Sequence, residues 1–126
     1  MKKITLYTDG ACSGNPGVGG WGAVLMYNGY EKRISAAEEC TTNNRMEVTA
    51  VIEGLKCLKE ACIVDVYSDS AYTVNAFNRG WIFDWERSGW KKADNKQLLN
   101  EDLWRELFNL SKIHKLNFIK VKGHAD

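Results

Sequence analysis

The sequence has no long apolar run, almost no net charge and no cysteine pattern of a zinc site. No stretch approaches the roughly 18 apolar residues of a membrane span, and the start carries no signal-peptide pattern. The four cysteines form no Cys-x-x-Cys pair, so we expect free thiols in a reducing compartment and a cytoplasmic protein. The net charge is only +1, so composition gives nucleic-acid binding no support and any basic surface must come from local arrangement.

The chain also lacks internal repeats, low-complexity segments and linkers, which predicts a single domain over residues 1–126. Hydrophobic residues make up 44% and charged residues 26% of the sequence, ordinary values for a globular protein. A domain of this length buries about two thirds of its unfolded surface and needs no disulfides to fold. We expect a monomer with no membrane contact.

Hydrophobic periodicity divides the chain into five strands and three helices. The expected strands cover 3–9, 21–27, 30–35, 63–67 and 116–121, and the expected helices cover 43–59, 70–80 and a segment that Asn100 caps. Asn28-Gly29 is a strong signal for a type I′ turn between antiparallel strands. Residues 81–97 are the least regular stretch. This order predicts an α/β fold with a five-stranded mixed sheet, in which three antiparallel strands are followed by parallel additions and helices pack on the sheet.

Three acidic residues stand where one expected element gives way to the next. Asp9 closes the first strand and opens a glycine-rich turn, Glu47 lies in the first turn of a helix, and Asp69 ends the fourth strand. Ligands of α/β sheets bind beyond the carboxyl ends of the strands, so parallel strands joined by this helix would bring the three together. Taken singly, Asp9 could begin an Asx turn and Asp69 could cap a helix. Together they predict a Mg²⁺ site, because a hard cation offsets the repulsion between carboxylates.

The segments around these acids resemble those of ribonuclease H of type 1. They are 8–17 (TDGACSGNPG), 41–47 (TTNNRME), 68–70 (SDS) and 121–125 (VKGHA). Residues 89–91 and 100–104 are similar to it as well. The four segments follow the family's order and spacing over nearly the whole chain, which makes the resemblance specific.

The resemblance implies the ribonuclease H fold and an endonuclease that cleaves the RNA strand of an RNA–DNA hybrid with two Mg²⁺ ions. It implies that Asp9, Glu47 and Asp69 are the metal ligands, with Asp9 bridging the ions. His124 is implied to assist proton transfer or product departure, a role that a near-neutral pKa permits. Two ions would activate a water, neutralise charge on the phosphate and stabilise the leaving oxygen.

The resemblance also implies a set of substrate contacts. Asn15, Asn43 and Asn44 are similar to minor-groove contacts of the hybrid, whose 2′-hydroxyls separate RNA from DNA. Thr42 and Asn100 are implied to form the DNA-phosphate pocket. Trp81 and Trp85 are implied to form the aromatic wall of the DNA channel. Lys91 and Lys92 are implied to be nearby phosphate partners. Other interpretations stay open: Asn43 could be a plain N-cap, Trp81, Trp85 and Trp90 could cover a local core, His124 could be an ordinary loop residue, and Arg45 is expected to be a scaffold residue.

Three features depart from the family. Its fourth metal carboxylate lies on a final helix, whereas this sequence stops two residues after His124; either the chain is incomplete or the protein lacks both the acid and the helix. With three carboxylates we expect weaker binding of the second ion, low activity or a need for Mn²⁺. Cys40 stands where the family often has an arginine in the phosphate pocket. Acidic residues in 81–97 nearly cancel the basic ones, so we expect weaker substrate binding there.

Two rival hypotheses follow from these departures. The first is a catalytically weak or inactive relative that still binds hybrids. The second is a ribonuclease H domain detached from a polymerase or a larger assembly, against which the start at Met1 and the absence of a linker count.

Overall fold

The computed structural model describes residues 1–123 of the chain. Its elements are β1 (Lys2–Gly14), β2 (Gly17–Tyr27), β3 (Tyr30–Thr41), α1 (Asn43–Lys56), β4 (Cys62–Ser68), α2 (Ala71–Asn78), α3 (Trp81–Arg87), α4 (Glu101–Ile113) and β5 (Lys115–Lys120). Within this described part, no helix is long and apolar enough to cross a membrane. All four cysteines are free thiols, as the sequence predicts.

The five strands form one mixed sheet in the order β3-β2-β1-β4-β5. β1, β2 and β3 are antiparallel neighbours, whereas β4 runs parallel to β1 and β5 runs parallel to β4. Asn28 and Gly29 have φ values of 48° and 83°, the positive values that a type I′ turn requires. The predicted fold class is confirmed.

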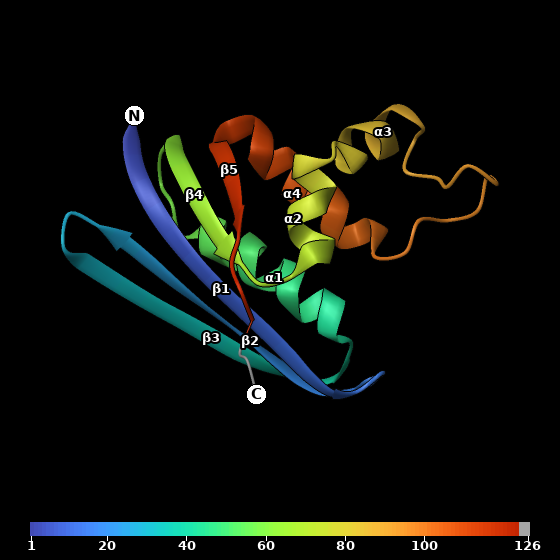
Figure 1. The fold of residues 1–126 in the computed structure, drawn as a ribbon, viewed down its shortest axis with the longest axis horizontal. Helices are drawn as coiled ribbons and strands as arrows, with labels where there is room; N and C mark the ends of the chain where they lie inside the picture. The colour runs from blue at the N-terminus through green and yellow to red at the C-terminus, as the bar shows by residue number, and fades with distance from the viewer. Residues whose placement is uncertain (124–126) are drawn as a thin grey trace.

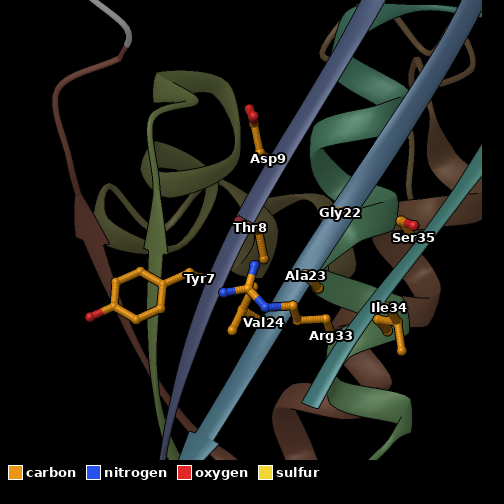
Figure 2. Close-up of a pocket in the computed structure, with 9 residues that line it drawn as sticks. All are labelled: Tyr7, Thr8, Asp9, Gly22, Ala23, Val24, Arg33, Ile34 and Ser35. Carbon is orange, nitrogen blue, oxygen red and sulfur yellow. The ribbon is translucent and has the colours of Figure 1, made fainter. Parts of the chain in front are cut away.

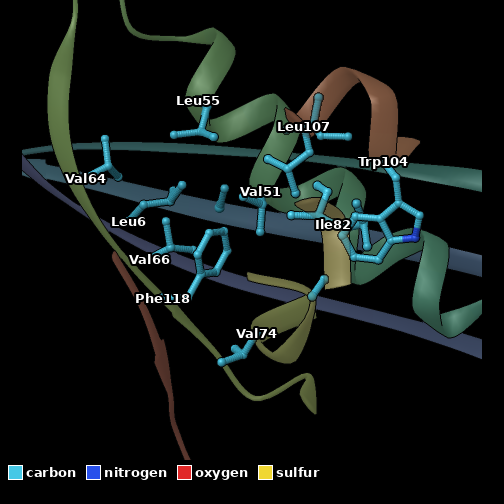
Figure 3. Close-up of a cluster of buried hydrophobic side chains, with 14 of the residues drawn as sticks. Leu6, Val51, Leu55, Val64, Val66, Val74, Ile82, Trp104, Leu107 and Phe118 are labelled. Atoms are coloured by element: carbon cyan, nitrogen blue, oxygen red, sulfur yellow. The ribbon is translucent and has the colours of Figure 1, made fainter. Parts of the chain in front are cut away.

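The helices gather on one side of the sheet (Figure 1). α1 packs against the centre of the sheet, where a Cβ at Gly54 would lie 2.7 Å from Leu6 Cδ1. Glycine therefore lets this helix approach β1 closely. Between the layers lies a core of aliphatic and aromatic side chains that includes Leu6, Val51, Leu55, Val64, Val66, Trp104, Leu107 and Phe118 (Figure 3).

β2 and β3 are longer than the expected 21–27 and 30–35, and two further segments differ from the prediction. The glycine-rich segment after Asp9 is no turn, because β1 continues to Gly14 and pairs with β2 from Thr5 to Gly14. Residues 81–87 form the helix α3, which the mixed charges of this stretch had concealed. The helix is stabilised by Ile82, which is 0% exposed, and by Trp85, which packs on the core.

Candidate active site

Asp9, Glu47 and Asp69 come together beside the C-terminal end of β4. One carboxylate oxygen from each lies within 4.8 Å of the others. The last residue pair between β1 and β4 is Tyr7 with Tyr67, so both aspartates lie two residues beyond the point where the parallel pairing ends. Asp9 therefore sits inside a long strand and not at a strand end, and it is the departure of β4 that opens space beside it.

The carboxylate of Glu47 is fixed by its contact with β1. The backbone N–H of Gly10 donates a hydrogen bond of 3.0 Å to Glu47 Oε1. A Cβ at Gly10 would lie 2.6 Å from the backbone of Met46 and Glu47, a distance that no side chain tolerates. The first turns of α1 can therefore approach β1 only because residue 10 is a glycine. The sequence alone did not single out Gly10.

The site is electrostatically strained without a counter-ion. Glu47 is only 3% exposed, and burial together with the charges of Asp69 and Asp9 raises its pKa to about 7, although the Gly10 hydrogen bond opposes the change. Its Oε2 atom is buried and has no hydrogen-bond partner among the described residues.

A divalent cation fits these observations. It would give Oε2 a partner and offset the repulsion that raises the pKa of Glu47. The donor set consists of carboxylate oxygens from Asp9, Glu47 and Asp69, which suits Mg²⁺ or Mn²⁺ better than softer metals.

A cleft of about 310 Å³ opens beside the carboxylates. It is lined by Gly10, Asn43, Asn44, Glu47, Asp69, Ser70, Ala71 and Tyr72. The two asparagines predicted to contact the substrate thus border the same cleft as two of the acids. Thr42, not Asn43, is the N-cap of α1, because its hydroxyl accepts from the backbone N–H of Arg45 at 3.3 Å. The interpretation of Asn43 as a plain N-cap is therefore wrong, and its side chain is exposed.

Other predicted residues lie around the cleft. Asn15 is exposed at the tip of the β1–β2 hairpin. The tip lies alongside the start of α1, because Gly17 pairs with Thr41. Gly123 also approaches the site, since a Cβ there would lie 3.1 Å from Asp69 Oδ2. The predicted catalytic His124 falls outside the described residues.

Arg45 connects the two residues assigned to a DNA-phosphate pocket. Its backbone N–H bonds to Thr42, and its Nη1 donates to Asn100 Oδ1 at 3.1 Å. Arg45 also forms a two-pronged ion pair with Asp102 at 3.0 and 2.7 Å, which fits the expected scaffold role. Asn100 does not cap α4 with its side chain as predicted, because its backbone is left-handed with φ 62° and its amide bonds elsewhere. Cys40 is exposed.

Trp81 and Trp85, which were predicted for a DNA channel, differ in exposure from each other and from the nearby Trp90. Trp81 is 36% exposed and Trp90 only 7%. Trp85 lies between, with its ring centroid 6.4 Å from that of Trp81 and 5.2 Å from that of buried Trp104. Trp90 thus belongs to a local core, whereas Trp81 is partly exposed at the surface. α3 and the loop after it lie at the far end of the molecule from β3 (Figure 1).

Charges near these tryptophans partly cancel. Arg87 pairs with Asp84, so its charge is offset within α3. Lys91 and Lys92 are exposed, and across residues 1–123 neither forms an ion pair. Together with Lys96, which is also exposed and forms no ion pair within residues 1–123, these two lysines are cations that this segment leaves to an anionic partner.

A second hollow of about 380 Å³ lies along β1, β2 and β3 on the face away from the helices (Figure 2). Tyr7, Val24 and Arg33 stand over it, and Asp9 marks one end. Of the three carboxylates, Asp9 alone lines it.

Comparison with known proteins assigns the chain to a family. A family model described as RNase H matches residues 1–126. The chain is 58% identical to a protein of Acetivibrio thermocellus named Ribonuclease H, over all of this chain and 86% of that protein. It is 60% identical to one of the same name from Thermoanaerobacter pseudethanolicus, over 81% of that protein.

A solved structure agrees with this assignment. The crystal structure of LC9-RNase H1, a type 1 RNase H with the type 2 active-site motif, superposes with a TM-score of 0.84 at 31% identity, over 98% of this chain and 64% of that one. The chain therefore belongs to the ribonuclease H family of nucleases.

Proposed function

We propose that this protein hydrolyses the RNA strand of RNA–DNA hybrids by a two-metal-ion mechanism, with Asp9, Glu47 and Asp69 as the metal ligands. The observation that carries the proposal is the convergence of these carboxylates within 4.8 Å around a buried, unpartnered Glu47 oxygen. When bound, two Mg²⁺ ions would activate a water and neutralise charge on the scissile phosphate. Asp9, which belongs to the central strand, is the ligand we assign to both ions.

The chain's own groups prepare this site. Gly10 holds one oxygen of Glu47 through its N–H and leaves the other for the cation. Burial of Glu47 keeps bulk water from that oxygen. We assign to His124 the transfer of a proton at the leaving oxygen. We expect products with 3′-hydroxyl and 5′-phosphate ends.

Substrate recognition is assigned to the polar residues around the cleft. Asn43 and Asn44 border the carboxylates and, with Asn15, carry amides that both donate and accept, as contact with a 2′-hydroxyl requires. We place the DNA strand along Thr42 and Asn100, then against the channel residues named above: Trp81, Trp85, Lys91 and Lys92. A solved structure with 24% identity and a TM-score of 0.64, that of LC11-RNase H1, is of a complex with an RNA/DNA hybrid.

We further propose that a monomer is the working unit, because all three carboxylates come from one chain. The four free thiols are consistent with the reducing cytoplasm as the place of action.

A cleavage assay tests the proposal. The purified protein is incubated with an RNA–DNA hybrid labelled on the RNA strand, with Mg²⁺ or with Mn²⁺, and with RNA–RNA and DNA–DNA duplexes as controls. We expect cleavage of the hybrid alone, and its loss in Asp9→Asn. Asp65→Asn is the matched control, because Asp65 lies on β4 outside the cluster, where it accepts from Asn117 at 3.1 Å. Binding without cleavage in both metals would contradict the enzymatic proposal, and cleavage by Asp9→Asn would contradict the metal site.

A further inference from the structure

The side-chain amide of Asn100 is held from both ends. Its Oδ1 accepts from Arg45 Nη1 at 3.1 Å, and its Nδ2 donates to the hydroxyl of Tyr72 at 3.0 Å. These partners lie 55 and 28 residues away in the sequence. They belong to α1 and α2, so the start of α4 is joined through this one amide to two other helices.

The chemistry of the partners fixes which way the amide faces. A guanidinium only donates hydrogen bonds, so the amide atom that faces Arg45 must be the oxygen. The Tyr72 hydroxyl acts as an acceptor, because it also receives the indole N–H of Trp104 at 3.0 Å. Asn100 therefore directs its oxygen toward Arg45 and its NH₂ group toward Tyr72. One of the two NH₂ hydrogens is not used in this network.

Both partners are themselves immobilised. Arg45 is held by the paired hydrogen bonds to Asp102. The ring of Tyr72 lies 5.2 Å, between centroids, from that of Trp104, which is 0% exposed. The remaining N–H of Asn100 thus has a direction set by an ion-paired guanidinium and by a ring packed on Trp104.

We propose that Tyr72 is a positioning residue for the nucleic-acid backbone: it orients the amide of Asn100 so that the free N–H donates to a phosphodiester oxygen of the DNA strand. This rests on the proposed function, which assigns Asn100 to that strand. Tyr72 lies three residues after Asp69 and lines the acidic cleft. It therefore links the place of RNA hydrolysis to the contact that sets the register of the DNA strand.

The variant Tyr72→Phe tests the role, because it keeps the ring against Trp104 and removes only the acceptor. We expect it to raise KM for the hybrid about three- to tenfold, the factor carried by one neutral hydrogen bond, and to change kcat much less. Tyr30→Phe is the matched control: Tyr30 is 79% exposed at the far hairpin, and we expect its KM to equal that of the wild type.

A double-mutant cycle separates positioning from a purely structural role. Tyr72→Phe also leaves the Trp104 indole N–H without its partner, so thermal stability falls whether or not Asn100 is present. Its effect on KM should vanish in an Asn100→Ala background, because the group through which it acts is gone. The proposal would be overturned if Tyr72→Phe raised KM by the same factor with Asn100 and with Ala at position 100. It would also be overturned if Asn100→Ala alone left KM unchanged.

Direct binding keeps the test independent of catalysis. The same cycle is measured as Kd by fluorescence anisotropy, with Asp9→Asn in every variant to prevent cleavage. Hybrids with a single uncharged methylphosphonate at successive DNA positions locate the contacted phosphate. Replacing that phosphate should weaken hybrid binding by the parent protein more than hybrid binding by the Tyr72→Phe variant. If each methylphosphonate lowered the affinity of the parent and of the Tyr72→Phe variant by the same factor, the positioning role would be contradicted. A wild type that binds but never cleaves would refute the proposed hydrolysis and leave this cycle valid.

Discussion

Gly10 and Glu47 lie in van der Waals and hydrogen-bond contact across the junction of β1 and α1. The Gly10 N–H donates to Glu47 Oε1 at 3.0 Å, and a Cβ at Gly10 would lie 2.6 Å from the Glu47 backbone nitrogen. The spacing between strand and helix at this point is therefore set by the absence of a side chain. The same contact fixes the only buried carboxylate of the three.

Gly10→Ala should damage the site more than the fold. The methyl group forces α1 away from β1, which costs about 1–3 kcal/mol of unfolding free energy, the usual range for overpacking. Displacement of Glu47 should lower kcat by at least about 100-fold, because misplacement by roughly 1 Å has this effect in catalytic sites. Urea unfolding and hybrid cleavage measure the two effects. Gly22→Ala is the matched control, since the nearest atom to its Cβ is 3.9 Å away; an equal loss of activity in both variants would contradict the explanation.

Glu47 should make the metal-free protein less stable as pH rises. Its pKa is about 7 in the folded protein against an ordinary value of 4.5, so the folded state binds more protons between these values. The free energy of unfolding then decreases as pH increases through this window, by up to about 3 kcal/mol. Chemical unfolding at pH 4.5 to 8 measures the slope. Glu47→Gln removes the ionisation, so the variant should gain stability relative to the wild type over the same range.

Mg²⁺ should reverse this dependence of the free energy of unfolding on pH. Binding to the ionised carboxylates favours the folded state and releases the proton of Glu47 near pH 7. Calorimetric titration in two buffers of different ionisation enthalpy measures the release. The assignment of Glu47 as a ligand would be contradicted if Mg²⁺ did not change the stability of the wild type at pH 8. It would also be contradicted if the Glu47→Gln variant released as many protons on Mg²⁺ binding as the wild type.

Much of the arrangement around Glu47 follows from local sequence pattern. The three- and four-residue spacing of Val48, Val51 and Leu55 places Glu47 on the packed face of α1, and all four are buried. The parallel pairing of the strands near Asp9 and Asp69 follows from the helix that joins them. Periodicity was sufficient here because these relationships depend on residues close in the chain.

The contacts that the sequence did not reveal depend on distant partners. β1 extends beyond Asp9 because β2 supplies hydrogen bonds as far as Gly14, whereas glycines in isolation indicate a turn. Asn100 has the residue type and place of an N-cap, but Arg45 and Tyr72 engage its amide. No local pattern contains the information that these three residues meet.

Trp81 and Trp85 should separate binding from stability. Trp81→Ala removes an exposed ring and should raise Kd for the hybrid about tenfold, the size of one strong interface contact, with little change in Tm. Trp85→Ala removes a ring packed 5.2 Å from Trp104 and should lower the unfolding free energy by about 2–4 kcal/mol. Anisotropy with labelled hybrid and thermal unfolding measure the two quantities. Unchanged Kd in Trp81→Ala would show that the ring is no part of the DNA channel.

His114 should make the fold sensitive to acid. The residue follows α4 and is 4% exposed, and its Nδ1 accepts the backbone N–H of Cys62 at 3.1 Å. Burial lowers the pKa of His114 below its ordinary 6.5, so below that pH the unfolded chain takes up a proton that the folded protein does not. The free energy of unfolding therefore falls as pH decreases from 6.5 toward the lower folded pKa, by no more than about 1.4 kcal/mol per pH unit for one proton.

The variant His114→Asn isolates this effect from that of Glu47, which acts in the opposite direction. Asparagine keeps an acceptor oxygen near the position of Nδ1 but has no proton to gain. Urea unfolding from pH 7.5 to 5 should show the wild type losing stability relative to the variant only below pH 6.5. Parallel curves for the two proteins would contradict the prediction. They would mean that the imidazole is protonated as readily between α4 and β4 as it is in the unfolded chain.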